Sequence, residues 1–181
     1  MKYYKYPNPY ITDDEIATEY IEVRDDLIVR QLSAFEHYYI SSNVDLFLAD
    51  QPFEYEEIKD WDEGIVTIAA DEFNAVWQKH LQHHEVKWIE SKKSFPINKS
   101  VIGCIKMFFP QGIIVQLDQQ VFGVADYAQA RASANPSSMY PRYQIAGIVT
   151  GYDEANQWIE LGSPQIYADK QCDLDTWHSP I

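Results

Sequence analysis

The sequence predicts an α+β protein in two parts, a small antiparallel sheet with one helix followed by a five-stranded β-barrel. Short apolar runs separated by turn residues recur along most of the 181 residues, which is typical of strands. One stretch, residues 71–81, has helical periodicity instead. The 46% hydrophobic and 14% aromatic content indicates a folded chain. We expect domains at residues 1–95 and 99–166 and a polar tail at 167–181.

The sequence of the first part predicts four short strands. It opens with a turn at residues 7–9, where two prolines flank Asn8. Apolar runs at residues 20–23 and 27–32 flank Arg24-Asp25-Asp26, which predicts a hairpin. Residues 37–41 and 65–68 predict two further strands.

Between the third and fourth predicted strands, the acidic residues 51–63 contain Pro52 and predict a loop. The helix is predicted next, at residues 71–81. Asp71 and Glu72 suit its first turn, beside the positive end of the helix dipole. The helical spacing is carried by Phe73, Val76, Trp77, His80 and Leu81. Residues 92–98, with a Lys pair and a proline, predict the boundary between the two parts.

The second part predicts a small antiparallel barrel. Pro110-Gln111-Gly112 is the turn between its first two strands, and a polar loop separates the third strand from the fourth. Five short strands with these turns are typical of an OB-like β-barrel. The strands are expected at residues 101–109, 112–117, 121–125, 143–152 and 157–161.

The net charge of −14 is concentrated in the first half. Residues 1–98 carry 20 acidic against 9 basic residues, and residues 99–181 carry 8 against 5. Such an acidic surface repels nucleic-acid phosphates and attracts a basic protein. The alternative is that the charge serves only solubility. We expect a basic protein as the partner of this chain, and neither a nucleic acid nor a membrane.

The two cysteines, Cys104 and Cys172, are too few for a disulfide framework. Cys104 lies in an apolar strand and is expected to be a small core residue. The first residues contain no apolar stretch of a signal peptide, and no run is long enough to span a bilayer. These features predict a cytoplasmic protein.

Three histidines, His80, His83 and His84, end the predicted helix at a spacing that could hold Zn²⁺. The fourth ligand of such a site is unspecified. The alternative is that these histidines are exposed at the helix C-terminus, where positive charge is favoured by the dipole. We expect no structural metal and no cofactor.

No phosphate-binding glycine loop, nucleophile elbow or zinc-protease motif is present. We therefore expect a non-catalytic binding protein rather than an enzyme. A single-stranded RNA-binding barrel is the alternative, with aromatic rings that stack on bases and cations that contact phosphates. Its electrostatic footprint is weak, since residues 99–166 carry 4 basic against 5 acidic residues. The candidate residues are Lys106, Phe108, Phe109, Phe122, Arg131, Arg142 and Tyr152.

Residues 100–163 resemble the RNA-binding repeat of the ribosomal S-one protein and of polynucleotide phosphorylase. The resemblance implies an OB-like fold and binding of single-stranded RNA. It rests on Gly103, Phe108 or Phe109, and residues 112–117, 122–126, 149–154 and 159–161.

The first half is similar to small bacterial proteins encoded near polymorphic toxins. The similarity rests on residues 20–23, 29–32, 48–52 and 68–77. It implies an immunity protein that neutralises a cognate toxin. Toxin nucleases are commonly basic, so an acidic inhibitor rich in Tyr and Trp complements them. The residues expected to bind the partner are Asp45, Asp50, Glu54, Tyr55, Glu56, Glu57, Asp60, Trp61, Asp62 and Glu63.

Overall fold

A computed structural model describes residues 1–8, 16–48, 64–133 and 138–172. The chain divides into two compact units, residues 1–84 and residues 85–181. The sequence predicts the boundary at residues 92–98, and the structure divides the chain between residues 84 and 85. A helix at residues 85–94 therefore belongs with the barrel.

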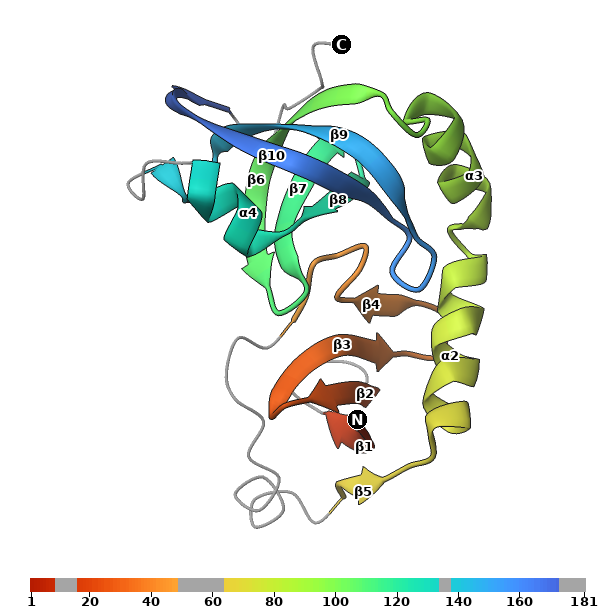
Figure 1. The fold of residues 1–181 in the computed structure, drawn as a ribbon. Coiled ribbons are helices and arrows are strands. Elements are labelled where there is room, and N and C mark those ends of the chain that lie inside the picture. The colour runs from red at the N-terminus through yellow and green to blue at the C-terminus, as the bar shows by residue number, and fades with distance from the viewer. Residues whose placement is uncertain (9–15, 49–63, 134–137, 173–181) are drawn as a thin grey trace. The chain divides into compact units, whose positions relative to one another are not determined.

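In its described residues, the first unit is a five-stranded antiparallel sheet with one helix (Figure 1). The order of its strands is β4-β3-β2-β1-β5. The elements are β1 (Lys2–Asn8), β2 (Ala17–Arg24), β3 (Leu27–Ala34), β4 (Tyr39–Ser41), β5 (Val66–Thr67) and α2 (Ala70–Gln82).

The hairpin predicted around Asp25 and Asp26 is confirmed as β2 and β3. Both residues have positive φ, 51° and 60°, which aspartate tolerates better than most side chains in a tight hairpin turn. The turn predicted at residues 7–9 is wrong for Pro7, because β1 extends through it and pairs it with Thr18. A proline is accepted there because β5 pairs with Tyr4 and Lys5, and within the described residues no strand on that side needs an N–H from Pro7.

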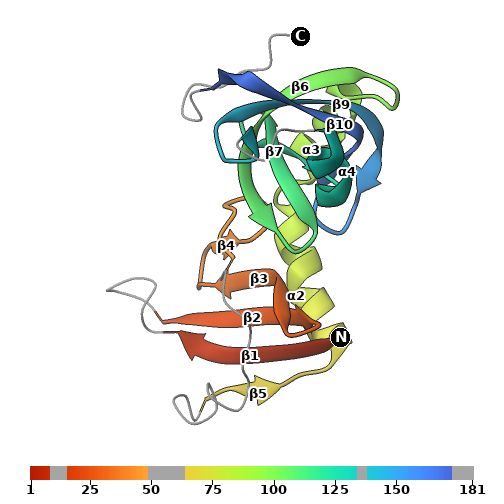
Figure 2. The same cartoon turned by 60° about the vertical axis from the view of Figure 1, so that its left-hand side comes forward.

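Helix α2 confirms the helix predicted at residues 71–81. Figures 1 and 2 both show it running across the strands of the sheet. Its Phe73, Trp77 and Leu81 are buried against Leu32 of β3. Tyr3, Tyr20 and Tyr39 come from three other strands and pack against the same cluster. The opposite face of the sheet carries a second apolar cluster of Tyr4, Ile21, Val23, Ile28 and Ile65.

The second unit contains a closed five-stranded barrel, with strands at all five predicted places. Its order is β10-β8-β7-β6-β9, and β10 pairs with β9 antiparallel and with β8 parallel. Its elements are α3 (Glu85–Ser94), β6 (Ser100–Phe109), β7 (Gly112–Asp118), β8 (Val121–Ala125), α4 (Tyr127–Ser133), β9 (Tyr143–Asp153) and β10 (Trp158–Gln171).

The barrel core is filled by alternate side chains of its strands. Ile113, Val115 and Leu117 of β7 point inward, together with Ile159 and Leu161 of β10. The same core also contains Trp88 of α3, Phe95 directly after α3, and Ala130 of α4. Neither α3 nor α4 is among the elements predicted from sequence, and a polar loop is predicted at the position of α4.

Two features near the end of the chain differ from the sequence-based expectation. The predicted polar tail starts at residue 167, whereas β10 continues to Gln171. Cys104 is fully buried, as expected, but it is bonded to Cys172 in a disulfide instead of standing as a free core residue. Among the helices in the described part of the chain, none has the length and apolar character to cross a membrane.

Candidate functional site

Of the ten residues expected to bind a partner, Asp45 is the one that the structure describes. It is exposed in the turn after β4, and its Oδ2 accepts hydrogen bonds from the backbone N of Ser41 at 2.8 Å and from its hydroxyl at 3.3 Å. Asp45 therefore shapes this turn in addition to carrying charge. The other nine lie outside the described residues: Asp50, Glu54, Tyr55, Glu56, Glu57, Asp60, Trp61, Asp62 and Glu63.

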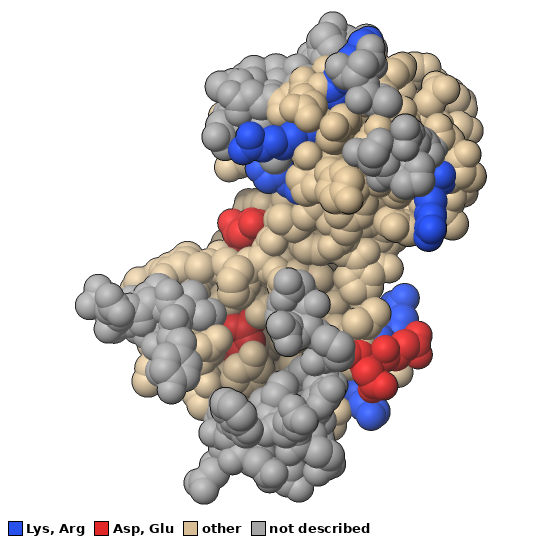
Figure 3. Space-filling view, turned by 90° about the vertical axis from the view of Figure 1, so that its left-hand side faces the viewer, with Lys and Arg blue, Asp and Glu red and all other residues tan. Residues whose placement is uncertain are grey.

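Exposed carboxylates are spread over the described surface of the first unit. Asp25 and Asp26 project from the β2–β3 turn. Glu72 on α2 forms an ion pair with Lys5 of β1, with 2.6 Å between Nζ and Oε1. Figure 3 shows acidic side chains (red) on the face of this unit that it draws. The exposed acidic residues are Asp25, Asp26, Glu36, Asp45, Asp71 and Glu72.

Two glutamates of β2 are buried, and their surroundings differ. Glu22 forms an ion pair with Arg30 of β3, and the Arg30 guanidinium lies 4.9 Å from the ring centre of Phe73 and 5.1 Å from that of Trp77. Glu19 accepts a hydrogen bond from the Ser33 hydroxyl at 2.8 Å. Burial raises the pKa of Glu19, and hydrogen bonds from its polar neighbours offset this effect in part. Sequence patterning missed both residues, because alternation alone does not show which acidic positions are buried.

The three candidate metal ligands do not act alike. His80 is buried, and its Nε2 lies 2.9 Å from Oδ1 of Asn43. Its ring also packs edge-on against Tyr39 and His84. His83 is exposed, and its ring contacts Tyr39. Within the described residues, no group of His, Cys, Asp or Glu is arranged to hold a metal ion.

The environment of His80 keeps its imidazole neutral. The pKa of His80 is lowered to about 4, mainly by burial and to a smaller extent by the neighbouring His84 and His83. With Nε2–H donating to Asn43, the Nδ1 atom has no hydrogen-bond partner among the described residues. The ring thus joins α2 to the turn after β4, as a structural contact.

One of the nucleic-acid candidates, Phe108, contacts an exposed ring of α4. The Phe108 ring of β6 packs edge-on against Tyr127 of α4, with ring centres 6.0 Å apart. The two side chains are 37% and 47% exposed. Arg131 lies one helical turn after Tyr127, on the same side of α4. Tyr127 was not among the predicted residues, because the helix that carries it was not predicted.

Lys106, two residues before Phe108 on β6, is half-buried at an irregularity in the pairing with β7. Figure 3 shows several Lys and Arg side chains (blue) on the barrel. We call Phe108, Tyr127 and Arg131 the barrel-end group. It combines two exposed rings with one cation.

The remaining candidates serve the fold. Phe109 packs against Trp158, with ring centres 6.2 Å apart. Phe122 is half-buried on β8, opposite Gln116. The Tyr152 hydroxyl donates to the backbone carbonyls of Lys92 and Phe95. Arg142 is exposed, and its backbone joins β6 to the end of β10.

The outward side of β7 is buried as completely as its inward side. Ile114 and Gln116 alternate with the core residues of β7, so they point away from the barrel interior, and both are buried. Trp158 stands next to the core residue Ile159 on β10 and is buried too. OB-type barrels commonly bind ligands on the face of their second and third strands. On β7 this face carries no exposed ring.

A cluster around Lys92 attaches α3 to the β9–β10 connection. Glu154 accepts a hydrogen bond from the Trp88 indole at 2.7 Å and another from the Lys92 ammonium at 2.9 Å. That ammonium also lies 5.1 Å from the ring centre of Trp88 and 5.8 Å from that of Tyr152. Burial raises the pKa of Glu154, but the two hydrogen bonds outweigh it and the pKa is lowered overall.

No family model matches this chain, and the searches of curated proteins and of solved structures found no match either.

Proposed function

We propose that this chain is a non-catalytic binding protein whose acidic first unit binds a basic protein partner. The observation that supports this proposal is the difference in net charge between the two compact units. Residues 1–84 contain 18 acidic against 6 basic residues, and residues 85–181 contain 10 against 8. Six acidic side chains of the first unit are exposed in its described part. A surface with charge of one sign speeds the encounter with a partner of the opposite sign. This electrostatic attraction becomes weaker as the salt concentration rises.

In its finer form, the proposal is an immunity protein that neutralises a cognate bacterial toxin in the cytoplasm. The similarity of residues 20–23, 29–32, 48–52 and 68–77 to proteins encoded beside toxins supports this form. A basic toxin nuclease is the class of partner that the charge favours. In a reducing cytoplasm, the Cys104–Cys172 bridge would be exposed to thiol reductants.

The test begins with the neighbouring gene, which should encode a large secreted toxin. The toxin domain and this chain are then mixed in a calorimeter at low and at high salt. We expect tight binding whose affinity falls steeply with salt, and survival of cells that express both proteins. A housekeeping neighbour, or binding that is indifferent to salt, contradicts the proposal.

The charge argument also has a matched pair of variants. Asp25→Asn with Asp26→Asn removes two exposed charges from the first unit, and asparagine tolerates the positive φ of both positions. Glu85→Gln with Glu90→Gln removes two exposed charges from the second unit. We expect the first pair to slow association with the toxin more than the second pair does. Equal effects would show that the acidic unit does not guide the partner.

The barrel-end group favours a second candidate, a module that binds single-stranded RNA. Its barrel order and the helix between the third and fourth strands are OB-like. Two exposed rings beside Arg131 offer a stacking surface and a phosphate contact. We would measure fluorescence anisotropy of a labelled oligouridine at low salt. Binding lost in Phe108→Ala and Tyr127→Ala, and kept in Tyr140→Ala, supports this candidate; no binding at low salt excludes it.

A further inference from the structure

The only two cysteines of the chain are bonded to each other across the barrel. Cys104 lies in the middle of β6, and Cys172 follows directly after the last residue of β10. Their Cα atoms are 6.3 Å apart, within the range of unstrained bridges. Cys104 is fully buried and Cys172 is 8% exposed. The bridge therefore fixes the end of the last strand to a strand with which it does not pair.

Apart from the bridge, the end of β10 is held weakly. The pairing of β10 with β9 has two irregularities, at residues 160–161 and 162–165, and then reaches Ile166, which faces Ile145 and is the last β10 residue in the barrel core. The next pair is Gln171 with Tyr143, so the extra residues of β10 between these two pairs bulge out of the ladder. Lys170 and Gln171 are exposed. We call residues 167–172 the strand end.

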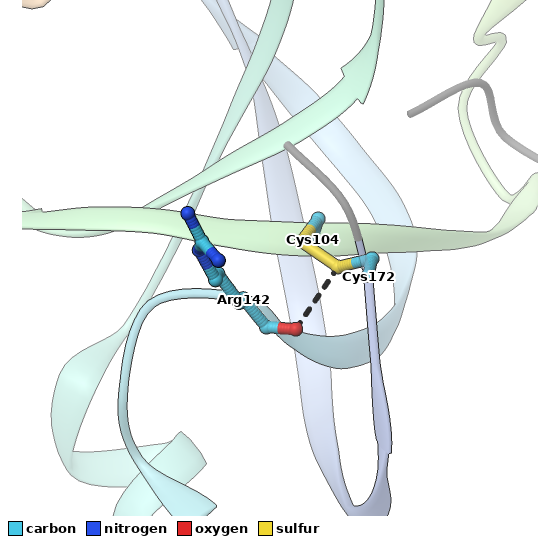
Figure 4. The surroundings of a disulfide bond; sticks show 3 residues. All are labelled: Cys104, Arg142 and Cys172. Atoms are coloured by element: carbon cyan, nitrogen blue, oxygen red, sulfur yellow. Dashed lines mark hydrogen bonds between the residues drawn. A yellow bond between two sulfur atoms is a disulfide. The ribbon is translucent and has the colours of Figure 1, made fainter. Parts of the chain in front are cut away.

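The backbone of Arg142 links β6, which carries Cys104, to Cys172 at the end of β10. Its N donates to the carbonyl of Ile105 on β6 at 2.8 Å, and its carbonyl accepts from the N of Cys172 at 2.7 Å. The same carbonyl lies 3.1 Å from the Cys172 sulfur (Figure 4). Figure 4 also shows the Arg142 guanidinium pointing away from the bridge.

We infer that the Cys104–Cys172 disulfide is a redox latch: reduction releases the strand end from β9 while the barrel up to Ile166 stays closed. This inference is independent of the proposed function. The closed pairs of β10 with β8 and β9 lie before Ile166 and do not involve the cysteines. Local release is therefore expected to cost much less than opening the barrel.

The reductant is a dithiol. Its thiolate attacks the Cys172 sulfur, since this is the more accessible of the two, and a mixed disulfide with Cys172 forms as the bond to Cys104 breaks. The Cys104 thiolate that leaves takes up a proton. The second thiol of the reductant, as its thiolate, then displaces Cys172, which is also protonated. In total the bridge gains two electrons and two protons, and the dithiol becomes a cyclic disulfide.

Trypsin measures the release of the strand end, because Lys170 lies within it. The full chain is incubated with trypsin with and without dithiothreitol, quenched in acid, fully reduced and weighed by mass spectrometry. We expect cleavage after Lys170 to speed up at least about tenfold on reduction, since cleavage requires the strand end to open. Cleavage after Lys93, exposed on α3, serves as the reference and should not change.

Hydrogen exchange locates the change. The amides of Gln171 and Cys172 should exchange faster after reduction, whereas those of Ile113, Val115 and Leu117 in β7 should keep their protection. Cys172→Ser should behave like the reduced protein with or without dithiothreitol, and the oxidised wild type should contain no free thiol. Unchanged cleavage and exchange overturn the inference. Loss of protection throughout the barrel, or free thiols before reduction, overturns it as well.

Discussion

The Nε2 atom of His80 lies 2.9 Å from Oδ1 of Asn43, so a buried imidazole joins α2 to the turn after β4. The surroundings of the ring favour its neutral form, because a proton added at Nδ1 would be buried with no acceptor among the described residues. The stability of the first unit therefore depends on the protonation state of a single histidine.

We predict that the first unit loses stability in mild acid. His80 has a folded pKa of about 4, below the ordinary value of 6.5, so the unfolded chain binds the proton first as the pH falls. The contribution of neutral His80 to the free energy of unfolding is fully present above pH 6.5 and is lost as the pH falls toward 4. The free energy of unfolding measured with urea should be lower at about pH 4.5 than at about pH 7.5, and His80 should account for roughly 2–3 kcal/mol of the difference. His80→Gln should lose much of this difference, and His83→Gln, at an exposed position, should keep it.

The two buried glutamates of β2 should respond oppositely to removal of their charge. Because the folded pKa of Glu19 is raised, its contribution is complete below the pKa of the unfolded chain and is lost as the pH rises through the folded value. Glu19→Gln should therefore raise the urea midpoint at neutral pH. Glu22→Gln leaves the Arg30 guanidinium without its buried partner and should cost about 3 kcal/mol. A loss of stability in both variants would contradict the account of Glu19.

Gly103 should be intolerant of a side chain. A Cβ at this position of β6 would lie 2.8 Å from the carbonyl oxygen of Gln116 and closer still to the Val115 side chain on the paired strand. Gly103→Ala should cost about 3 kcal/mol or prevent the barrel from closing. Gly147→Ala is the control, since its Cβ would meet Leu161 at 3.3 Å. It should change the thermal midpoint of the barrel far less than Gly103→Ala does.

The elements found from sequence are those whose own residues carry the pattern. The barrel strands could be predicted because they are short apolar runs bounded by turn residues, and α2 because its apolar residues recur at helical spacing. β1 was missed because Pro7 is typical of a turn, and its tolerance at this position depends on how short β5 is. α3 carries no such pattern, because Val86 and Ile89 are exposed while Trp88 and Ser91 are buried. α4 is short and rich in alanine.

The candidate sites were harder to predict, because they join residues far apart in the chain. Trp88 and Glu154 are separated by 66 residues, and the two cysteines by 68. Neither contact leaves a trace in local sequence. The nucleic-acid candidates were predicted from residue type and not from exposure. The fold distinguishes Phe108, which is exposed, from Tyr152, whose hydroxyl donates a hydrogen bond to the backbone carbonyl of Phe95.

The parallel pairing of β10 with β8 also determines when the barrel can form during synthesis. Ile159, Glu160 and Leu161 complete the ring by joining Gly123, Val124 and Ala125. Until they leave the ribosome, β8 has one exposed edge, and the core side chains of β6 and β7 have no closed interior. The first unit has its own core in residues that are made earlier. The nascent chain therefore passes through a stage with a folded sheet and an open barrel, when chaperone binding matters most.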